Sequence, residues 1–330
     1  MNDRLKKVFT IFFINLILSF TFSASAQEVA VKKGSMKPTG LLQTRFSHFW
    51  KESGVDTFSL RRAEIGFPGK LNKDISYNIR LGIDGGHSWP LREACVKVMY
   101  IPRTELTLGQ FKPPFGLEVL TSSAKLDFIN KTMSTKQCKC KPVERDIGVQ
   151  AKVNVDYVTC SVALVNGTGG NVFADDNDSK DLVGRVQIKP PVEGLSIGVD
   201  GYLGKKGEEE VDRNRYGVDL SYTKGPYMAK SELLGAKNDT VNSLGFYGQA
   251  GYMVRLGEEL AINMIQPVIR FERWDGNTDK EKDASVIITA GVNLFFDGHA
   301  TKLQINYVLV REEDTQVDND ELLAQFQVNF

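Results

Sequence analysis

Cysteine and histidine are scarce in this sequence, which holds four cysteines and three histidines in 330 residues. A fold stapled by disulfides needs a denser cysteine framework. Cys138 and Cys140 lack the usual ligand spacing of a zinc site and have no histidine beside them. We therefore interpret the cysteines as incidental, allowing at most one disulfide, and we expect no metal and no other cofactor.

The sequence also has no excess of positive or negative charge, because 41 basic side chains balance 41 acidic ones. This balance gives no reason to expect a nucleic acid as partner. Beyond residue 26 the sequence also has no apolar run of the roughly 18 residues that a membrane-spanning helix requires. A helical membrane protein is therefore not expected.

One apolar run does stand at the N-terminus. Arg4, Lys6 and Lys7 precede the uncharged stretch VFTIFFINLILSFTF, which small residues end at Ala26. A basic start, an apolar middle and an Ala-Ser-Ala exit are typical of a secretory signal peptide. We predict that residues 1–26 are removed and that residues 27–38 form a short linker. A membrane anchor helix is the alternative, and the exit has no cysteine that would indicate a lipoprotein.

Nearly everything after Thr39 alternates between apolar and polar residues. In the stretch DISYNIRLGID, for example, Ile75, Ile79 and Ile83 share one face, whereas Asn78 and Arg80 share the other. A period of two predicts β-strands. Several of these segments reach the roughly 9–11 residues with which a tilted strand crosses a bilayer.

The connections between these segments alternate in length. Short turns such as IPRT and FDGH alternate with longer polar loops such as WDGNTDKEKD. The resulting count is about sixteen strands with both ends on the short-turn side, the arrangement of an outer-membrane β-barrel. We predict an all-β, transmembrane antiparallel barrel over residues 39–330. A soluble β-sandwich or barrel is the alternative.

The last strand ends on an aromatic residue. In ELLAQFQVNF, Phe326, Val328 and Phe330 alternate with polar residues up to the final position. A barrel needs its last strand paired with its first, since an open edge in lipid leaves backbone groups unsatisfied. The terminal Phe330 also resembles the C-terminal signal that barrel assembly machinery recognises.

Three stretches resemble the phosphate-selective porin O and P family: FSLRRAEIGFPGKLNKDISYNIRLGID, LTLGQFKPPFGLEVLTSS and RDIGVQ. The resemblance implies a sixteen-stranded, usually trimeric barrel in the outer membrane of a Gram-negative bacterium. It further implies a third loop that folds inward and narrows the pore, arginines along the wall, lysines at the constriction, and small anions such as phosphate as solutes.

The residues themselves point to the same loop. Residues 113–144 are long for a loop of a compact protein, and such loops are usually functional or disordered. The stretch SSAKLDFINKTM predicts a short helix capped by Ser122 or Ser123, with Leu126, Phe128 and Ile129 as its buried side.

The charge of this loop is mostly positive, because the sequence from Lys112 to Arg145 contains seven basic residues and three acidic ones. Rings of basic residues select anions in pores. The candidate constriction residues are Lys125, Lys131, Lys136, Lys139, Lys141 and Arg145. A solvated external loop is the alternative.

Strand parity predicts the pore wall. The basic residues predicted to face the lumen include Arg45, Arg62, Arg80, Lys97, Lys152 and Arg185. Acidic residues share this face, among them Glu64 beside Arg62 and Glu272 beside Arg270, so wall ion pairs compete with an anion path.

We predict a passive pore for small hydrophilic solutes that prefers anions or phosphate, not an enzyme. A general, non-selective porin is the alternative. A barrel hydrolase with a rim active site is less favoured, because His48, His87 and His299 are the only histidines available to it.

Overall fold

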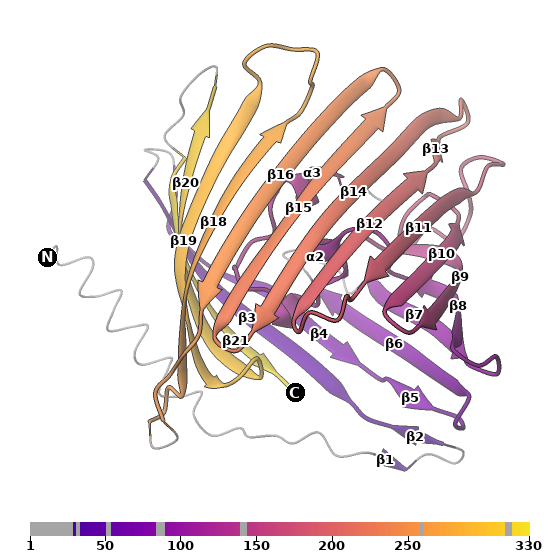
Figure 1. Cartoon of the computed structure of the whole chain (residues 1–330), viewed down its shortest axis with the longest axis horizontal. Coiled ribbons are helices and arrows are strands. Elements are labelled where there is room, and N and C mark those ends of the chain that lie inside the picture. Colours follow the sequence, from indigo (N-terminus) through magenta and orange to yellow (C-terminus); the bar gives the residue numbers. More distant parts are fainter. Residues whose placement is uncertain are drawn as a thin grey trace, which may run out of the picture.

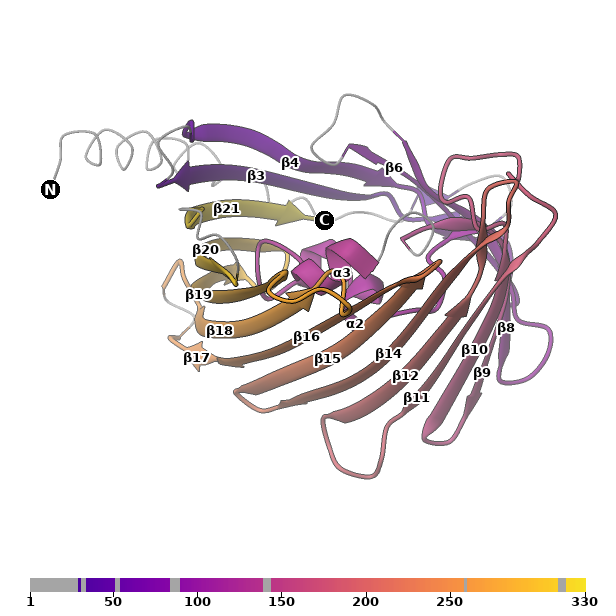
Figure 2. The ribbon, with the colours of Figure 1, turned by 90° about the horizontal axis from the view of Figure 1, so that it is seen from above.

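The computed structural model describes residues 29–30, 34–50, 54–83, 90–138, 144–257, 260–313 and 319–330. The predicted signal peptide lies outside these residues, as do Lys139, Lys141 and His87. Within the described chain, sixteen strands each pair antiparallel with their neighbours and close into a barrel (Figures 1 and 2). They are β3 (Thr39–Phe49), β4 (Thr57–Gly66), β6 (Ile75–Ile83), β7 (Leu91–Val98), β8 (Thr104–Phe111), β9 (Asp146–Val155), β10 (Val158–Val165), β11 (Asp181–Ile188), β12 (Leu195–Leu203), β14 (Val211–Lys224), β15 (Tyr227–Asn238), β16 (Val241–Tyr252), β18 (Met264–Asp275), β19 (Ala284–Asp297), β20 (Thr301–Glu312) and β21 (Glu321–Asn329).

Five two-residue strands supplement the barrel: β1 (Val29–Ala30), β2 (Ser35–Met36), β5 (Gly69–Lys70), β13 (Lys205–Lys206) and β17 (Val254–Arg255). β1 pairs with β2, and β2 pairs with β5. The segment expected to be a plain linker therefore extends the sheet beside the turn between β4 and β6. In the described residues no helix is long and apolar enough to cross a membrane.

The predicted alternation of the strands is confirmed. In β18, Gln266, Arg270 and Glu272 point inward and are buried, whereas Ile269 and Phe271 between them are 57% and 44% exposed. The same pattern recurs from β10 to β16. The outer surface of the barrel is therefore apolar, as a lipid-facing surface must be.

The predicted asymmetry of the connections is confirmed with two exceptions. Short turns join the strands at one end, called the short-turn end here, and longer connections lie at the other, the long-loop end. At the short-turn end, the connection around RLGEEL was expected to be short but runs from Met253 to Asn263, between β16 and β18. At the long-loop end, the exception is AKNDTVN, which was expected to be a longer loop. Only Asp239 and Thr240 separate β15 from β16, and Asp239 adopts a φ of 53°. Aspartate tolerates this conformation, which a tight two-residue hairpin requires.

Residues 112–145 are called the third loop here, and the described part, residues 112–138 and 144–145, enters the barrel. Figure 2 shows α2 (Leu117–Leu120) and α3 (Met133–Cys138) inside the ring of strands. The helix predicted over SSAKLDFINKTM is wrong for most of its length. Only a 3-10 turn, η1 (Ser123–Lys125), forms, and Ser122 makes no capping hydrogen bond with its side chain. Backbone groups from Leu126 to Ile129 bond to side chains of the wall, which excludes a helical hydrogen-bond pattern there.

The lumen is polar along much of its surface, but the described residues form two hydrophobic clusters there, and the smaller joins Phe128 of the third loop to Met228 and Val268. In the larger, Phe115 and Val119 of the third loop pack against inward-facing apolar residues of the wall, including Val183, Tyr202 and Leu234. The wall contributes these residues from several strands, namely Cys95, Phe111, Ala163, Val165, Val183, Tyr202, Leu234 and Ala236. Inward-facing apolar side chains are therefore covered here by the loop rather than by water.

The barrel closes through the first and last strands. β21 pairs with β3 from Glu321 opposite Phe49 to Asn329 opposite Leu41. Beyond this ladder, Gly40 and Phe330 exchange two backbone hydrogen bonds of 2.8 and 2.9 Å. The ring of Phe330 lies over Gly40, where a Cβ atom would collide with it. A glycine at residue 40 thus lets the terminal aromatic ring cover the seam.

We expect Gly40→Ala to weaken this seam by about 1 kcal/mol, the low end for an added methyl group, because it displaces the half-exposed ring of Phe330. The midpoint temperature at which the folded band disappears from unboiled detergent gels should fall. Gly201→Ala in β12 is the matched control, since a Cβ atom there meets nothing within 4 Å. Equal midpoints for the two variants would refute the role of this seam.

Candidate functional site

The third loop is held against the inner wall at three places. The first is the start of α2, where Glu232 of β15 accepts hydrogen bonds from the backbone N–H groups of Leu117 (2.7 Å) and Glu118 (3.3 Å). The buried side chain of Glu118 in turn accepts hydrogen bonds from the backbone and the hydroxyl of Thr132, both at 2.9 Å. One wall carboxylate and one loop carboxylate therefore join the two halves of the loop to the barrel.

The second place is at Asp127 of the loop. Its side chain accepts hydrogen bonds from Lys230 at 2.6 Å and from Gln249 at 3.0 Å. Its backbone carbonyl accepts bonds from Asn293 and Gln304. Inward-facing side chains of four strands, β15, β16, β19 and β20, thus converge on one loop residue.

The third place is at Arg270 of β18. Its guanidinium forms an ion pair with Glu272 at 2.7 Å and lies 3.5 Å from Glu118. It also donates a hydrogen bond to the carbonyl of Asn130 and lies over the ring of Phe128, 4.4 Å from the centroid. Because Glu272 accepts a bond from the backbone N–H of Met133, this ion pair fixes the start of α3.

The loop rests on one arc of the wall and leaves another arc uncovered. The inward-facing side chains of Asn293, Gln304 and Gln327 are at most 1% exposed beneath it. Those of Asn78 and Arg80 on β6 stay partly exposed. We call the partly exposed, inward-facing residues Glu64 of β4, Asn78 and Arg80 of β6, and Glu93 of β7 the open wall.

The loop lysines named from the sequence do not gather at one point. Lys125 is exposed at the end of η1, and Lys136 is exposed on α3. Lys131 is 9% exposed and bonds to the carbonyl of Val119 at 3.4 Å. Arg145 lies within 3.6 Å of both Glu93 and Glu144. Lys139 and Lys141 lie outside the described residues.

A basic cluster forms instead at the base of the loop. Burial lowers the pKa of Lys112 to about 7, and the charges of Lys131 and Arg145 lower it further, whereas Glu93 and Glu144 oppose this effect. The ammonium group of Lys112 donates to the carbonyls of Val119 at 2.9 Å and Thr121 at 3.5 Å. We call Lys112, Lys131 and Arg145 the basal cluster. Lys112 was missing from the residues singled out in the sequence, although it belongs to the same charge count.

The wall arginines and lysines named from the sequence face inward but are mostly paired. Arg185 binds Asp200 and Asp219, each at 2.7 Å. Arg80 pairs with Glu64 at 3.3 Å, and Lys97 pairs with Glu105 at 2.8 Å. Arg62 donates to Gln43 at 2.8 Å, Arg45 donates to Asn130 at 3.4 Å, and Lys152 lies opposite Glu105 in the ladder. The wall therefore carries ion pairs rather than a row of free cations.

Asp200, Asp219 and Glu232 form the one acidic group in the described residues whose ligand atoms could converge on a metal ion, within 4.8 Å of one another. The guanidinium of Arg185 already binds two of these carboxylates, and the third accepts two backbone hydrogen bonds from the loop. Ordinary protein contacts therefore account for this cluster.

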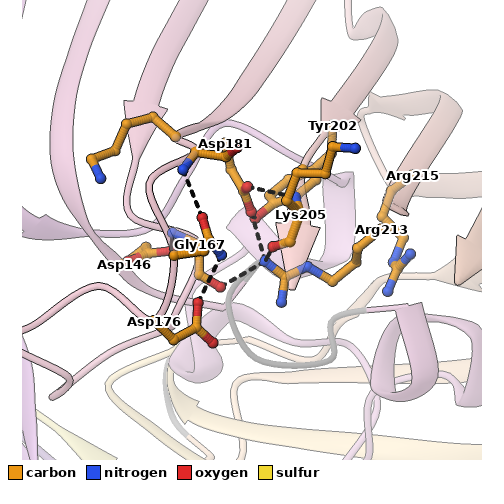
Figure 3. A network of polar contacts seen from close by, with 12 residues as sticks. Asp146, Gly167, Asp176, Asp181, Tyr202, Lys205, Arg213 and Arg215 are labelled. Carbon is orange, nitrogen blue, oxygen red and sulfur yellow. Dashed lines mark hydrogen bonds and ion pairs between the residues drawn. The ribbon is translucent and has the colours of Figure 1, made fainter. Parts of the chain in front are cut away.

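A second polar network shapes the long-loop end (Figure 3). Asp181 accepts hydrogen bonds from Tyr202, from Arg213 at 2.7 Å and from the backbone of Lys205 at 2.9 Å. Arg213 also donates to the carbonyl of Gly167 at 2.7 Å, and the backbone of that glycine donates to Asp146. These contacts tie the loop after β10 to the loop after β12 at the mouth of the barrel.

Features that could suggest an enzyme have ordinary roles here. His48 binds Asp56 at 2.6 Å, and among the described residues it makes no hydrogen bond to a serine or threonine hydroxyl. The stretch GLSIG over residues 194–198 has the spacing of a nucleophile elbow, but it lies on β12 rather than on a strand-turn-helix. Ser196 accepts a hydrogen bond from Gln187. Cys95 and Cys160 are free thiols.

We expect Asp127→Ala to loosen the inner part of the third loop, because Lys230 and Gln249 lose their common partner. Single-channel recordings in planar bilayers should show a noisier open current and a larger mean conductance. Asp175→Ala, which removes a carboxylate of the loop after β10, should leave both quantities unchanged. A quiet, wild-type current from Asp127→Ala would show that these bonds do not position the loop.

The comparisons with known proteins identify the fold and the family. OmpF of Salmonella typhi in complex with daunomycin has a TM-score of 0.70 and 14% identity, covering 92% of this chain and 100% of its own. An anion-selective porin from Comamonas acidovorans has a TM-score of 0.68 and 14% identity, covering 90% of this chain and 100% of its own. The outer membrane channel DcaP of Acinetobacter baumannii has a TM-score of 0.65 and 10% identity, covering 93% of this chain and 100% of its own.

These likenesses show a porin barrel and leave selectivity open. A search of curated proteins found no match. The family model described as phosphate-selective porin O and P matches residues 44–214 and 203–330, which together span most of the barrel. The chain is therefore an outer-membrane β-barrel channel and belongs to the phosphate-selective porin O and P family.

Proposed function

We propose that the protein is a passive diffusion pore in the outer membrane of a Gram-negative bacterium, with a preference for small anions such as phosphate. Solutes would pass down their gradient between the third loop and the open wall, and no bond would be made or broken. The observation that carries the anion preference is the basal cluster, where Lys112 and Lys131 both donate to the carbonyl of Val119 and Arg145 lies 3.6 Å from Glu93 of the open wall.

The physical basis of the preference is the short reach of charge in salt water. In physiological salt the field of a charge decays over about 8 Å, so only charges near the narrowest point affect selection strongly. A narrow passage with low-dielectric walls focuses the field and concentrates the opposite ion. Below about pH 7, where Lys112 is charged, three cations against Glu93 and Glu144 leave a positive excess there, whereas the paired cations of the wall contribute little. Any bound anion must also leave readily for conduction to proceed.

A general porin without anion preference is the second candidate, and the ion pairs of the wall favour it. Arg185, Arg80 and Lys97 each face a carboxylate, so the wall itself supplies no net attraction for anions. In that case the basal cluster would serve only to hold the base of the third loop.

We also propose a homotrimer, inserted with the help of barrel assembly machinery that recognises the terminal strand. One similar structure, OmpT of Vibrio cholerae, is described in a trimer form, with a TM-score of 0.66 and 10% identity. Phe330 is 49% exposed at the end of the chain, where a recognition factor can reach its ring.

The anion preference is tested by removing charge from the basal cluster. Lys112→Met and Lys131→Met keep an unbranched side chain only one heavy atom shorter and delete its positive charge. In a KCl gradient across a planar bilayer, we expect each variant to move the reversal potential toward that of a cation-preferring pore. The shift should shrink as salt rises, because screening shortens the reach of the field.

Lys206→Met is the matched control, since Lys206 is exposed in the connection between β12 and β14. Its reversal potential should equal that of the unmodified protein. If all three variants behave alike, the preference does not arise at the basal cluster. The predicted lysines Lys125 and Lys136 would then be the next positions to replace.

The lowered pKa of Lys112 makes the preference depend on pH. Because this pKa lies at about 7, the ammonium group is charged at about pH 6 and largely neutral at about pH 8.5. The chloride-to-potassium permeability ratio should therefore fall as pH rises through this range. Lys112→Met should remove most of the change, whereas Lys206→Met should retain it. A ratio that is flat with pH, or one that still changes in Lys112→Met, would contradict this assignment.

A further inference from the structure

A recess of about 230 Å³ lies between α3 and the wall formed by β18 to β21, on the long-loop side of the third loop. It is separate from the basal cluster except for Lys131, which contributes to its lining. Pockets for drug-sized ligands usually measure roughly 300–1,000 Å³. This recess therefore suits a smaller molecule, of about the size of an amino acid.

Two opposite charges face the recess without partners. Lys136 lines it from the loop, and Glu321 lines it from the start of β21. Within the described residues neither side chain makes an ion pair or a hydrogen bond. By contrast, Arg270 and Glu272, which also line the recess, already bind each other at 2.7 Å, and Glu312 accepts a hydrogen bond from Asn319 at 3.3 Å. Among the described lining residues, Lys136 and Glu321 are thus the two opposite charges left without a hydrogen bond or an ion pair.

An unsatisfied hydroxyl points to a polar occupant. Thr289 of β19 lines the recess, is 1% exposed, and its Oγ1 atom has no hydrogen-bond partner. A buried hydroxyl without a partner is unfavourable and is normally satisfied by a ligand or water. Asn306 and Asn319 lie on the same lining and can supply further polar contacts.

The remaining part of the lining is apolar. Val308 and Val310 of β20 point inward, are partly exposed, and lie beside the buried Ile287. Elsewhere in the barrel, inward-facing apolar residues such as Val183 and Leu234 are completely buried beneath the third loop. In the recess the two valines are left partly uncovered. Contact of this apolar surface with water is unfavourable, whereas covering it with an aliphatic group is favourable.

We propose that the recess binds a small zwitterion with an aliphatic side chain, such as an aliphatic α-amino acid, at the long-loop entrance of the pore, before the solute reaches the passage beside the open wall. Its carboxylate pairs with Lys136, its ammonium group pairs with Glu321, and its side chain covers Val308 and Val310. The inference rests on the proposed passage of solutes through the lumen and names a class of solute, but it does not depend on the anion preference.

The test measures the ion current through the full chain in a planar bilayer, with the probe added on the long-loop side. Millimolar L-leucine should interrupt the current reversibly. 4-Methylpentanoate is leucine without the ammonium group and isopentylamine is leucine without the carboxylate, so each should need a concentration about tenfold higher for the same block. Equal block by 4-methylpentanoate and leucine, or no block by leucine, would overturn the proposal.

Variants locate the block in the recess. Lys136→Met and Glu321→Gln should each raise the half-blocking leucine concentration about tenfold. Lys206→Met and Glu208→Gln are the charge-matched controls, since both residues are exposed in the connection between β12 and β14, and they should change nothing. Block that persists unchanged in Lys136→Met and Glu321→Gln would place it elsewhere and overturn the proposal.

Two further readouts keep the outcome interpretable. The comparison of the three probes uses the unmodified protein, so it decides the matter even if a variant fails to insert. The reversal potential of the same channels reports the anion preference separately. Leucine block without anion preference would remove the proposed selectivity alone, whereas anion preference without leucine block would remove the zwitterion site alone.

Discussion

Pairing of every backbone polar group in the strands is the constraint on which the rest of this structure depends. A strand in lipid has no water to satisfy a free edge, so β21 must meet β3 and the sheet must close. Closure gives each strand one face toward lipid and one toward the lumen. The inward face must then place its charged and polar side chains against each other, against water or against another segment of the chain.

The third loop is the segment that meets this demand over much of the wall. Glu232, Lys302 and Gln304 each bind backbone groups of the loop, which would be unsatisfied without them. Because these contacts hold the loop against one arc of the wall, the remaining passage lies beside the open wall. The charges that then matter are the few left near the opening. Most wall cations, such as Arg185 between two aspartates, serve the packing of the barrel instead.

The sequence was sufficient to predict the barrel, because strand alternation and loop length are local patterns that closure leaves unchanged. The prediction from the sequence failed for the third loop, where side chains of the lumen wall bind it. The backbone N–H of Glu118 donates a hydrogen bond to the carboxylate of Glu232, which lies 114 residues further along the chain. No local sequence pattern connects these two residues. The helix expected after Ser122 begins only at Met133. Backbone groups between Leu126 and Ile129 form hydrogen bonds with wall side chains instead of with one another.

One missed signal was visible in the sequence. Consecutive apolar residues occur at the long-loop ends of strands, as in VALV ending at Val165 and YVLV ending at Val310. Such runs break the alternation and mark inward-facing apolar surface. For Val165 the third-loop cluster covers that surface, and for Val310 the recess lies in front of it. The basal cluster was harder to foresee, because it joins the first basic residue of the loop to one near its middle and to its last.

The position of the passage between the third loop and the open wall is the central claim, and cysteine modification during single-channel recording tests it most directly. In a background without the native cysteines, a bulky thiol reagent should lower the conductance in steps when cysteine replaces Asn78 of the open wall. The same reagent should leave the current unchanged when cysteine replaces Gln304, which is 1% exposed beneath the loop. Blockage at Gln304 with an unaffected current at Asn78 would place the passage on the opposite side of the loop and contradict the account.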